Sequence, residues 1–131
     1  MQARLARLAR LFFKLFNGRT DTYAVQKTDP TGDVKYFRVD KPVLLETYER
    51  HLAGELVLGI YPLRADGTCT FAAVDVDVPD IELAKKVASL LPQPNYIERS
   101  RSGNHHIWMF FERPVDVEIL YDHCKTGLAY A

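Results

Sequence analysis

Cysteine is scarce and long apolar runs are absent in this chain of 131 residues. Its two cysteines, Cys69 and Cys124, lie far apart and do not have the spacing of metal ligands. We expect free thiols in a reducing cytoplasm, with one disulfide as the alternative. No apolar run approaches the roughly 18 residues that a membrane helix needs. The sequence therefore predicts a cytoplasmic protein that has no membrane partner.

An excess of charge of either sign is also missing. Seventeen lysines and arginines balance seventeen aspartates and glutamates, so the formal net charge is zero. The chain as a whole does not attract nucleic acid, and any polyanion must be bound by a local patch. One such patch is visible in the sequence, because Arg4, Arg7, Arg10 and Lys14 all precede the first acid, Asp21.

Residues 1–17 are predicted to form a basic amphipathic helix, and Asn17-Gly18 is expected to end it. Its arginines are spread along the segment and no cleavage site follows, so we do not expect a secretory signal. Three interpretations stay open: a packing helix with solvated basic side chains, a helix that contacts phosphates, and a helix on a membrane surface or a partner. Apolar residues recur at helical spacing, namely Leu5, Leu8, Phe12, Leu15 and Phe16.

Residues 18–131 are predicted to form the sheet-bearing core of a single domain, 1–131. Alternating apolar patterns and turn signals predict strands at 22–27, 34–39, 56–61, 68–77, 95–99 and 107–112. Helices are predicted within 43–55, after Asp80 and after Asp116, with both aspartates as caps. This order indicates an α+β fold, a mixed sheet with helices packed on it. Because the last helix reaches Ala131 without a stop signal, we expect the fold to be incomplete at the C-terminus.

Asp75 and Asp77 are difficult to explain by folding alone. Strand alternation places Val74, Val76 and Val78 on a core face and the two carboxylates on the other, about 6 to 7 Å apart. Two like charges this close repel each other, and a divalent cation removes the conflict. The pair therefore predicts a Mg²⁺ or Mn²⁺ site. The alternative is that both acids lie at a strand end and face water.

The segment ERSRSGNHHIW, residues 98–108, contains a second candidate site. Hydroxyls, a guanidinium and backbone amides meet at one turn, and these are the donors that a triphosphate needs. His106 is expected to share a strand face with Trp108 and Phe110, whereas His105 points to the opposite face or stays in the turn. We predict that the turn grips a nucleotide's phosphates, through Arg101, Ser102, Gly103, Asn104 and His106.

Three segments together resemble the catalytic domain of the archaeo-eukaryotic primase superfamily, the primase-polymerases. The segments are LFNGRTDTYA (15–24), HLAGELVLGIYPLRADGTCTFAAVDVDV (51–78) and ERSRSGNHHIWMFFERPV (98–115). The resemblance covers most of the chain and is greatest to the branch found in TOTE conflict systems and CRISPR-associated primase-polymerases. It implies an RRM-like catalytic core, of which this chain is the N-terminal part.

The resemblance also implies an activity and its residues. Asp75 and Asp77 match the family's metal-binding acid pair, and Ser102 and His106 match the serine and histidine that bind the incoming triphosphate, with Arg101 assisting by charge. The implied reaction is template-directed nucleotidyl transfer by a two-metal mechanism with Mg²⁺ or Mn²⁺. The implied partners are a nucleotide triphosphate, a single-stranded or primed DNA template, and a helicase or nuclease of the same mobile-element or defence system.

The chain departs from the family pattern in three places. The third metal-binding acid has no convincing match, because the later acids, Glu112, Asp116, Glu118 and Asp122, occur at a strand end or on the last helix. A single residue, His105, separates Asn104 from His106, whereas relatives usually have two residues between the asparagine and the histidine. The segment YFRVDKPVLLET has no cysteine where close relatives often carry a cluster, so we expect no zinc site there.

Two other functions are compatible with these residues. A non-catalytic module would bind nucleotide or single-stranded nucleic acid through Arg99, Arg101 and Trp108 or Tyr96. A rolling-circle or relaxase-type nuclease would need two metal-binding histidines separated by one hydrophobic residue and a tyrosine nucleophile, Tyr121 or Tyr130. Adjacent histidines diverge on a strand and chelate one metal badly, which disfavours the nuclease.

Overall fold

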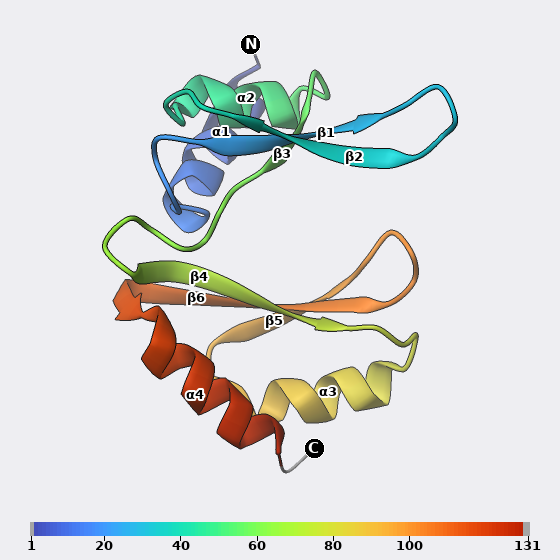
Figure 1. The fold of residues 1–131 in the computed structure, drawn as a ribbon, viewed down its shortest axis with the longest axis vertical. Coiled ribbons are helices and arrows are strands. Elements are labelled where there is room, and N and C mark those ends of the chain that lie inside the picture. Colours follow the sequence, from blue (N-terminus) through green and yellow to red (C-terminus); the bar gives the residue numbers. More distant parts are fainter. Residues whose placement is uncertain (1, 130–131) are drawn as a thin grey trace. The chain divides into compact units, whose positions relative to one another are not determined.

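The computed structural model describes residues 2–129, and the chain divides after Asp66 into two compact units (Figure 1). Each unit is described by itself, and one domain over residues 1–131 stays a prediction. The predicted α+β class is confirmed, with four helices and six strands in the described residues. The strands form two three-stranded antiparallel sheets instead of the one mixed sheet that we expected.

The first unit contains one sheet and two helices. The predicted hairpin of β1 and β2 is present, and β3 pairs with the other edge of β1, giving the order β2-β1-β3. Helix α1 packs against α2, with the Phe13 ring edge-on to the Tyr48 ring. The elements are α1 (Ala3–Leu15), β1 (Tyr23–Thr28), β2 (Val34–Val39), α2 (Leu45–Leu52) and β3 (Val57–Gly59).

Gly18 follows the end of α1 for a different reason from the one the sequence suggested. The helix ends at Leu15 with Phe16 as its C-cap, and Gly18 does not adopt a positive φ. Instead, the backbone of Gly18 lies against Tyr61: a Cβ there would overlap the Tyr61 carbonyl oxygen and lie 2.8 Å from Cγ2 of Ile60. The amide of Arg19 donates to the same carbonyl at 2.8 Å, which ties the chain after α1 to the segment after β3.

Gly18→Ala is therefore expected to destabilise the protein by about 1 to 3 kcal/mol, the usual cost of overfilling a packed site. Urea unfolding monitored by circular dichroism measures this loss. Thr20→Ala serves as the control, because Thr20 is exposed and its backbone carbonyl still accepts from the amide of Val43. Equal stability of the Gly18→Ala and Thr20→Ala proteins would contradict the close approach.

The second unit is a sheet of order β4-β6-β5 with α3 and α4 on one face (Figure 1). Its elements are β4 (Thr68–Val76), α3 (Ile81–Ser89), β5 (Asn95–Arg99), β6 (His105–Asp116) and α4 (Val117–Leu128). The predicted caps are confirmed: Asp80 accepts from the amides of Glu82 and Leu83, and Asp116 from that of Ile119. The core between helices and sheet comprises Val76, Val87, Ala88, Leu91, Ile107 and Met109.

Some predicted details of this unit differ. Ile81, expected in the buried stripe of α3, is the first residue of the helix and is 43% exposed, so the stripe begins one turn later at Ala84. Both cysteines are free, as predicted, and burial raises the pKa of each thiol because it disfavours the thiolate. None of the helices within residues 2–129 combines the length and apolarity needed to cross a membrane.

Candidate functional site

Three polar side chains form a row across the sheet of the second unit. In the register of the two antiparallel pairs, Asp75 of β4 is opposite His106 of β6, and His106 is opposite Glu98 of β5. Directly opposite residues on neighbouring strands share a face of a sheet, so the three side chains are neighbours. The row exists because the central strand β6 places a histidine between two acids that are far apart in the sequence.

The His106 ring contacts a carboxylate at each of its nitrogens. Nε2 lies 3.3 Å from Oδ1 of Asp75, and Nδ1 lies 2.9 Å from Oε1 of Glu98. The indole Nε1 of Trp108 also donates to this Glu98 oxygen, at 3.3 Å. The side chains of Asp75, Glu98 and His106 are 67%, 54% and 37% exposed. A ligand can therefore reach the row, while Glu98 fixes the ring from one side.

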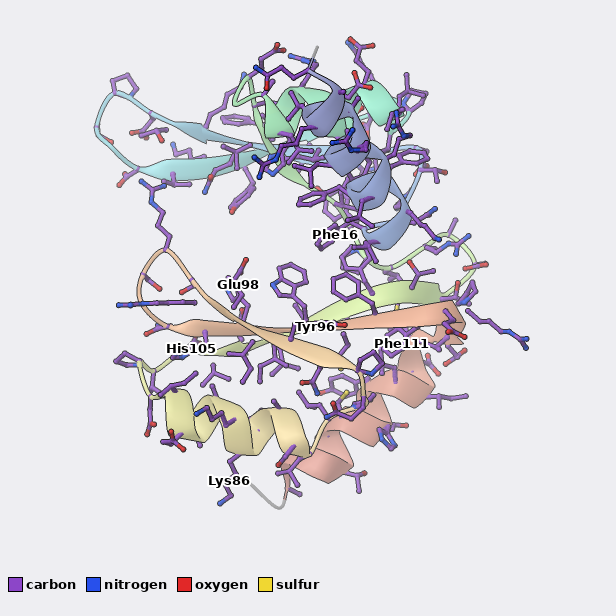
Figure 2. The ribbon with its side chains drawn as sticks, turned by 180° about the vertical axis from the view of Figure 1, so that it is seen from behind. Phe16, Lys86, Tyr96, Glu98, His105 and Phe111 are labelled. Atoms are coloured by element: carbon purple, nitrogen blue, oxygen red, sulfur yellow. The ribbon has the colours of Figure 1, made fainter. Side chains whose placement is uncertain are left out.

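The two adjacent histidines lie on opposite faces, as strand alternation predicts. His105 is buried on the side of the helices, where its Nδ1 is 3.4 Å from the carbonyl oxygen of Val78. Figure 2 shows Glu98 and His105 on different sides of the sheet. His106 and Trp108 share the other face, with their rings edge to face at 6.2 Å between centroids. Of the two histidines, His106 alone contacts Asp75 and Glu98.

Asp77 and the turn between β5 and β6 lie at the same end of the sheet. The last pair of β4 and β6 joins Val76 to His105, so Asp77 follows β4 where Asn104 precedes β6. Asp77 is exposed. The register therefore brings Asp75, Asp77 and the turn to one end of the sheet.

The turn is closed by its own hydrogen bonds. The amide of Ser100 donates to Asn104 and that of Gly103 to Ser100, so neither amide is spare for an anion. Gly103 adopts φ +91°, which is accessible to glycine at little cost. The hydroxyls of Ser100 and Ser102 are 3.0 Å apart, and Arg101 is exposed. Among the described residues, Arg101 takes part in no ion pair, and no hydrogen bond joins Ser102 to His106.

The donor chemistry of this end of the sheet suits a hard divalent cation. Asp75 and Asp77 offer exposed carboxylate oxygens, which Mg²⁺ and Mn²⁺ prefer, and one or two carboxylates per ion are sufficient when phosphates supply further oxygens. Within residues 2–129, no three histidine, cysteine, aspartate or glutamate side chains are grouped so that they could hold a metal ion by themselves. The two aspartates fit a cation that arrives with a phosphate ligand.

Glu98 is the site residue that sequence reasoning missed. It begins the segment 98–108, and its role depends on its pairing with His106 of the next strand. Since Ser100 bonds to Asn104 across the turn, counting outward pairs Arg99 with His105 and Glu98 with His106. The contact therefore follows from the hairpin register once the Ser100–Asn104 hydrogen bond of the turn is known.

The residues of the competing interpretations are less well placed. Tyr121 is 64% exposed on α4, and Tyr130 lies outside the described residues. The later acids do not join the row either: Asp116 caps α4, Glu118 and Asp122 are on α4, and Glu112 is in β6 well beyond His106. Neither the nuclease nor a third metal-binding acid gains support from this arrangement.

Comparison with known protein families identifies this chain's family. A family described as "TOTE conflict system, Archaeo-Eukaryotic Primase domain" matches residues 7–128. The match covers nearly the whole chain and includes both units and every residue of the row. No curated protein matches the sequence.

Proposed function

This chain belongs to the archaeo-eukaryotic primase domains of TOTE conflict systems, and we propose that it transfers nucleotides in a template-directed reaction. Primases of this superfamily generally use divalent metal ions and act on nucleotides and DNA. The observation that supports the proposal is the contact between Asp75, the first acid of the pair, and His106, the histidine assigned to the triphosphate. Residues of two motifs, 31 positions apart in the sequence, thus meet at one place.

Asp75 and Asp77 would hold Mg²⁺ or Mn²⁺ at the end of β4. When bound, the metal would supply charge that neutralises the triphosphate and lowers the pKa of the attacking hydroxyl. Rigid strands suit this task because ligands on regular elements are held more precisely than ligands on loops. The chain's own contribution would be two carboxylates, Asp75 in β4 and Asp77 directly after it, with Asp75 beside the His106 ring.

His106 and the turn would bind the incoming nucleotide's triphosphate. A ring that carries a proton on each nitrogen would donate to Glu98 from Nδ1 and, from Nε2 beside Asp75, to a phosphate oxygen. Arg101 and the Ser102 hydroxyl add a charged and a neutral donor from the turn, with Gly103 and Asn104 shaping it. His106 would act as an electrostatic clamp on the phosphates and not as a general base.

Glu98 would act as a positioning residue for His106. It accepts from Nδ1 of the ring and from the Trp108 indole, so two donors hold its carboxylate in place. In turn, the carboxylate keeps Nε2 directed toward Asp75. We do not expect Glu98 itself to touch the nucleotide.

Glu98→Ala is expected to weaken nucleotide binding about fivefold, the effect of losing ~1 kcal/mol of hydrogen bonding behind the ring. Glu98→Gln should restore most of the affinity, because its amide oxygen still accepts from Nδ1. Titration with a fluorescent nucleotide in the presence of Mn²⁺ measures both. If the glutamine variant binds as weakly as the alanine variant while both unfold at the wild-type urea concentration, the positioning role is wrong.

Primer extension on a DNA template with Mg²⁺ or Mn²⁺ tests the proposed reaction itself. Incorporation that depends on Asp75 supports a primase-polymerase. Nucleotide or single-strand binding without incorporation supports the second function compatible with the sequence, a non-catalytic binding module. A helicase or nuclease of the same conflict system is the partner we propose for the polymerase.

A further inference from the structure

Helix α1 presents a row of cations that the chain does not neutralise. Arg4, Arg7, Arg10 and Lys14 are all exposed. Among the described residues, none of the four takes part in an ion pair. The nearest acid in the sequence, Asp21, is already held by Arg19, with Nε 2.7 Å from Oδ1. The helix therefore carries four positive charges that the described residues do not pair, and an external anion can bind them.

The four cations, here called the basic stripe, occupy one side of the helix. At 100° per residue, Arg4, Arg7, Arg10 and Lys14 fall within about a third of a turn of the helix, opposite the fully buried Ala9. From the first to the last they extend over ~15 Å of helix axis, at 1.5 Å per residue. Duplex DNA places phosphates along each strand every ~3.4 Å of its axis, so this length faces about four nucleotides.

The net positive charge of the first unit comes from the stripe itself, because the unit's other seven lysines and arginines face eight acids. The first unit, residues 1–66, has eleven lysines and arginines against eight aspartates and glutamates, a net charge of +3, whereas residues 67–131 have six against nine, a net charge of −3. The neutral total thus conceals a separation of charge between the units. The acids of the neighbouring helix α2, such as Glu46 and Glu49, form no ion pair with the stripe within the part of the chain described.

Part of the apolar side of α1 packs inside the unit, which leaves a membrane only the partly exposed Leu8, Leu11 and Phe13, at 36%, 48% and 38%. A helix that lies in a membrane interface needs a free apolar face to insert. In this helix Ala9 is buried and Phe13 packs on Tyr48 of α2. The opposite, basic side is what α1 offers to a partner, and an anion of regular, closely spaced charge matches it.

We propose that the basic stripe of α1 binds the sugar-phosphate backbone of DNA. The identification of this DNA as the primer–template copied by the enzyme rests on the proposed function. The DNA binding of α1 rests only on the charges of the stripe. The contact is with phosphates only, so it is independent of base sequence and depends on salt. It gives the first unit a role in holding the strand while the second unit carries the nucleotide site.

The test compares two triple variants in binding a fluorescein-labelled primer–template duplex at 50 to 200 mM salt. One is Arg7→Gln/Arg10→Gln/Lys14→Gln, which keeps good helix formers in α1. The control, Lys85→Gln/Lys86→Gln/Lys125→Gln, removes three exposed cations from α3 and α4. Loss of three phosphate contacts should lower the slope of log K against log salt by about 2.7, so that over this range the wild type loses about fortyfold more affinity than the α1 variant.

The outcomes separate the possible partners. The proposal is supported if the α1 variant binds DNA more weakly with the shallower slope, keeps the wild-type circular dichroism spectrum, and differs from the control. Slopes equal to the wild type's in both variants overturn it. A membrane is the partner instead if the wild type and the control bind phosphatidylserine vesicles, the α1 variant does not, and the DNA slope is the same in all three proteins. If incorporation fails but the slope still falls, the proposed reaction is wrong and the stripe's DNA binding stands.

Discussion

Replacing Asp75 by asparagine is expected to reduce nucleotide incorporation about a thousandfold, the effect of losing ~4 kcal/mol of transition-state stabilisation. The amide has nearly the shape of the carboxylate, so it keeps the strand pairing, but it removes the negative charge that we assign to the divalent cation. Primer extension with Mn²⁺, followed by gel electrophoresis of a labelled primer, measures the change. Asp77→Asn should act in the same direction, since both carboxylates are assigned to the cation.

Asp122→Asn provides the matched control for this experiment. Asp122 is an exposed acid of α4 in the same unit, and it is not part of the row. Its replacement should leave incorporation at the wild-type rate. If Asp75→Asn retains full activity, the acid pair does not hold the catalytic metal. If neither the wild type nor any variant incorporates nucleotide but all bind it, the chain is a binding module.

Replacement by alanine is expected to affect a different property at each histidine: nucleotide affinity at His106 and stability at His105. His106→Ala should weaken nucleotide binding about 5- to 150-fold, which corresponds to the ~1 to 3 kcal/mol of a hydrogen bond to a charged group. His105→Ala should leave the nucleotide Kd unchanged and lower the stability, because His105 is only 6% exposed on the helix side of β6. Fluorescent nucleotide titration and urea unfolding of the same two proteins separate the effects.

This pair of variants is its own control, because the residues are adjacent and chemically identical. The assignment of His106 depends on strand alternation and on its contacts with Asp75 and Glu98. A loss of nucleotide affinity in His105→Ala that equals or exceeds the loss in His106→Ala, at unchanged stability, would mean that the wrong ring has been assigned to the triphosphate.

Strand alternation made the faces of the second unit predictable from the sequence. Apolar Val74, Val76 and Ile107 alternate with polar Asp75 and His106, and this periodicity of two is independent of how the strands are arranged. The caps Asp80 and Asp116 were predictable for a similar local reason, since each side chain bonds to amides two or three residues later. Local patterns were less reliable at helix ends, where Ile81 proved exposed and α1 ended at Leu15 before Asn17-Gly18.

Features that depend on distant pairing were not predictable in this way. The division into two sheets depends on β3 joining β1 and on β6 lying between β4 and β5. The need for glycine at position 18 depends on Tyr61, which is far along the chain. Glu98 is an intermediate case, because its contact with His106 follows from the hairpin register once the Ser100–Asn104 hydrogen bond is known.

The most direct measurement of the central claim, that a cation held by Asp75 lies beside a phosphate held by His106, uses Mn²⁺ as a paramagnetic probe. The imidazole signals of the four histidines are followed by NMR as Mn²⁺ and a deoxynucleoside triphosphate are added at substoichiometric levels. We expect the His106 signals to broaden first in the wild type and to stay sharp in Asp75→Ala. Sharp His106 signals in a wild-type protein that binds the nucleotide, or broadening that persists without Asp75, would contradict the claim.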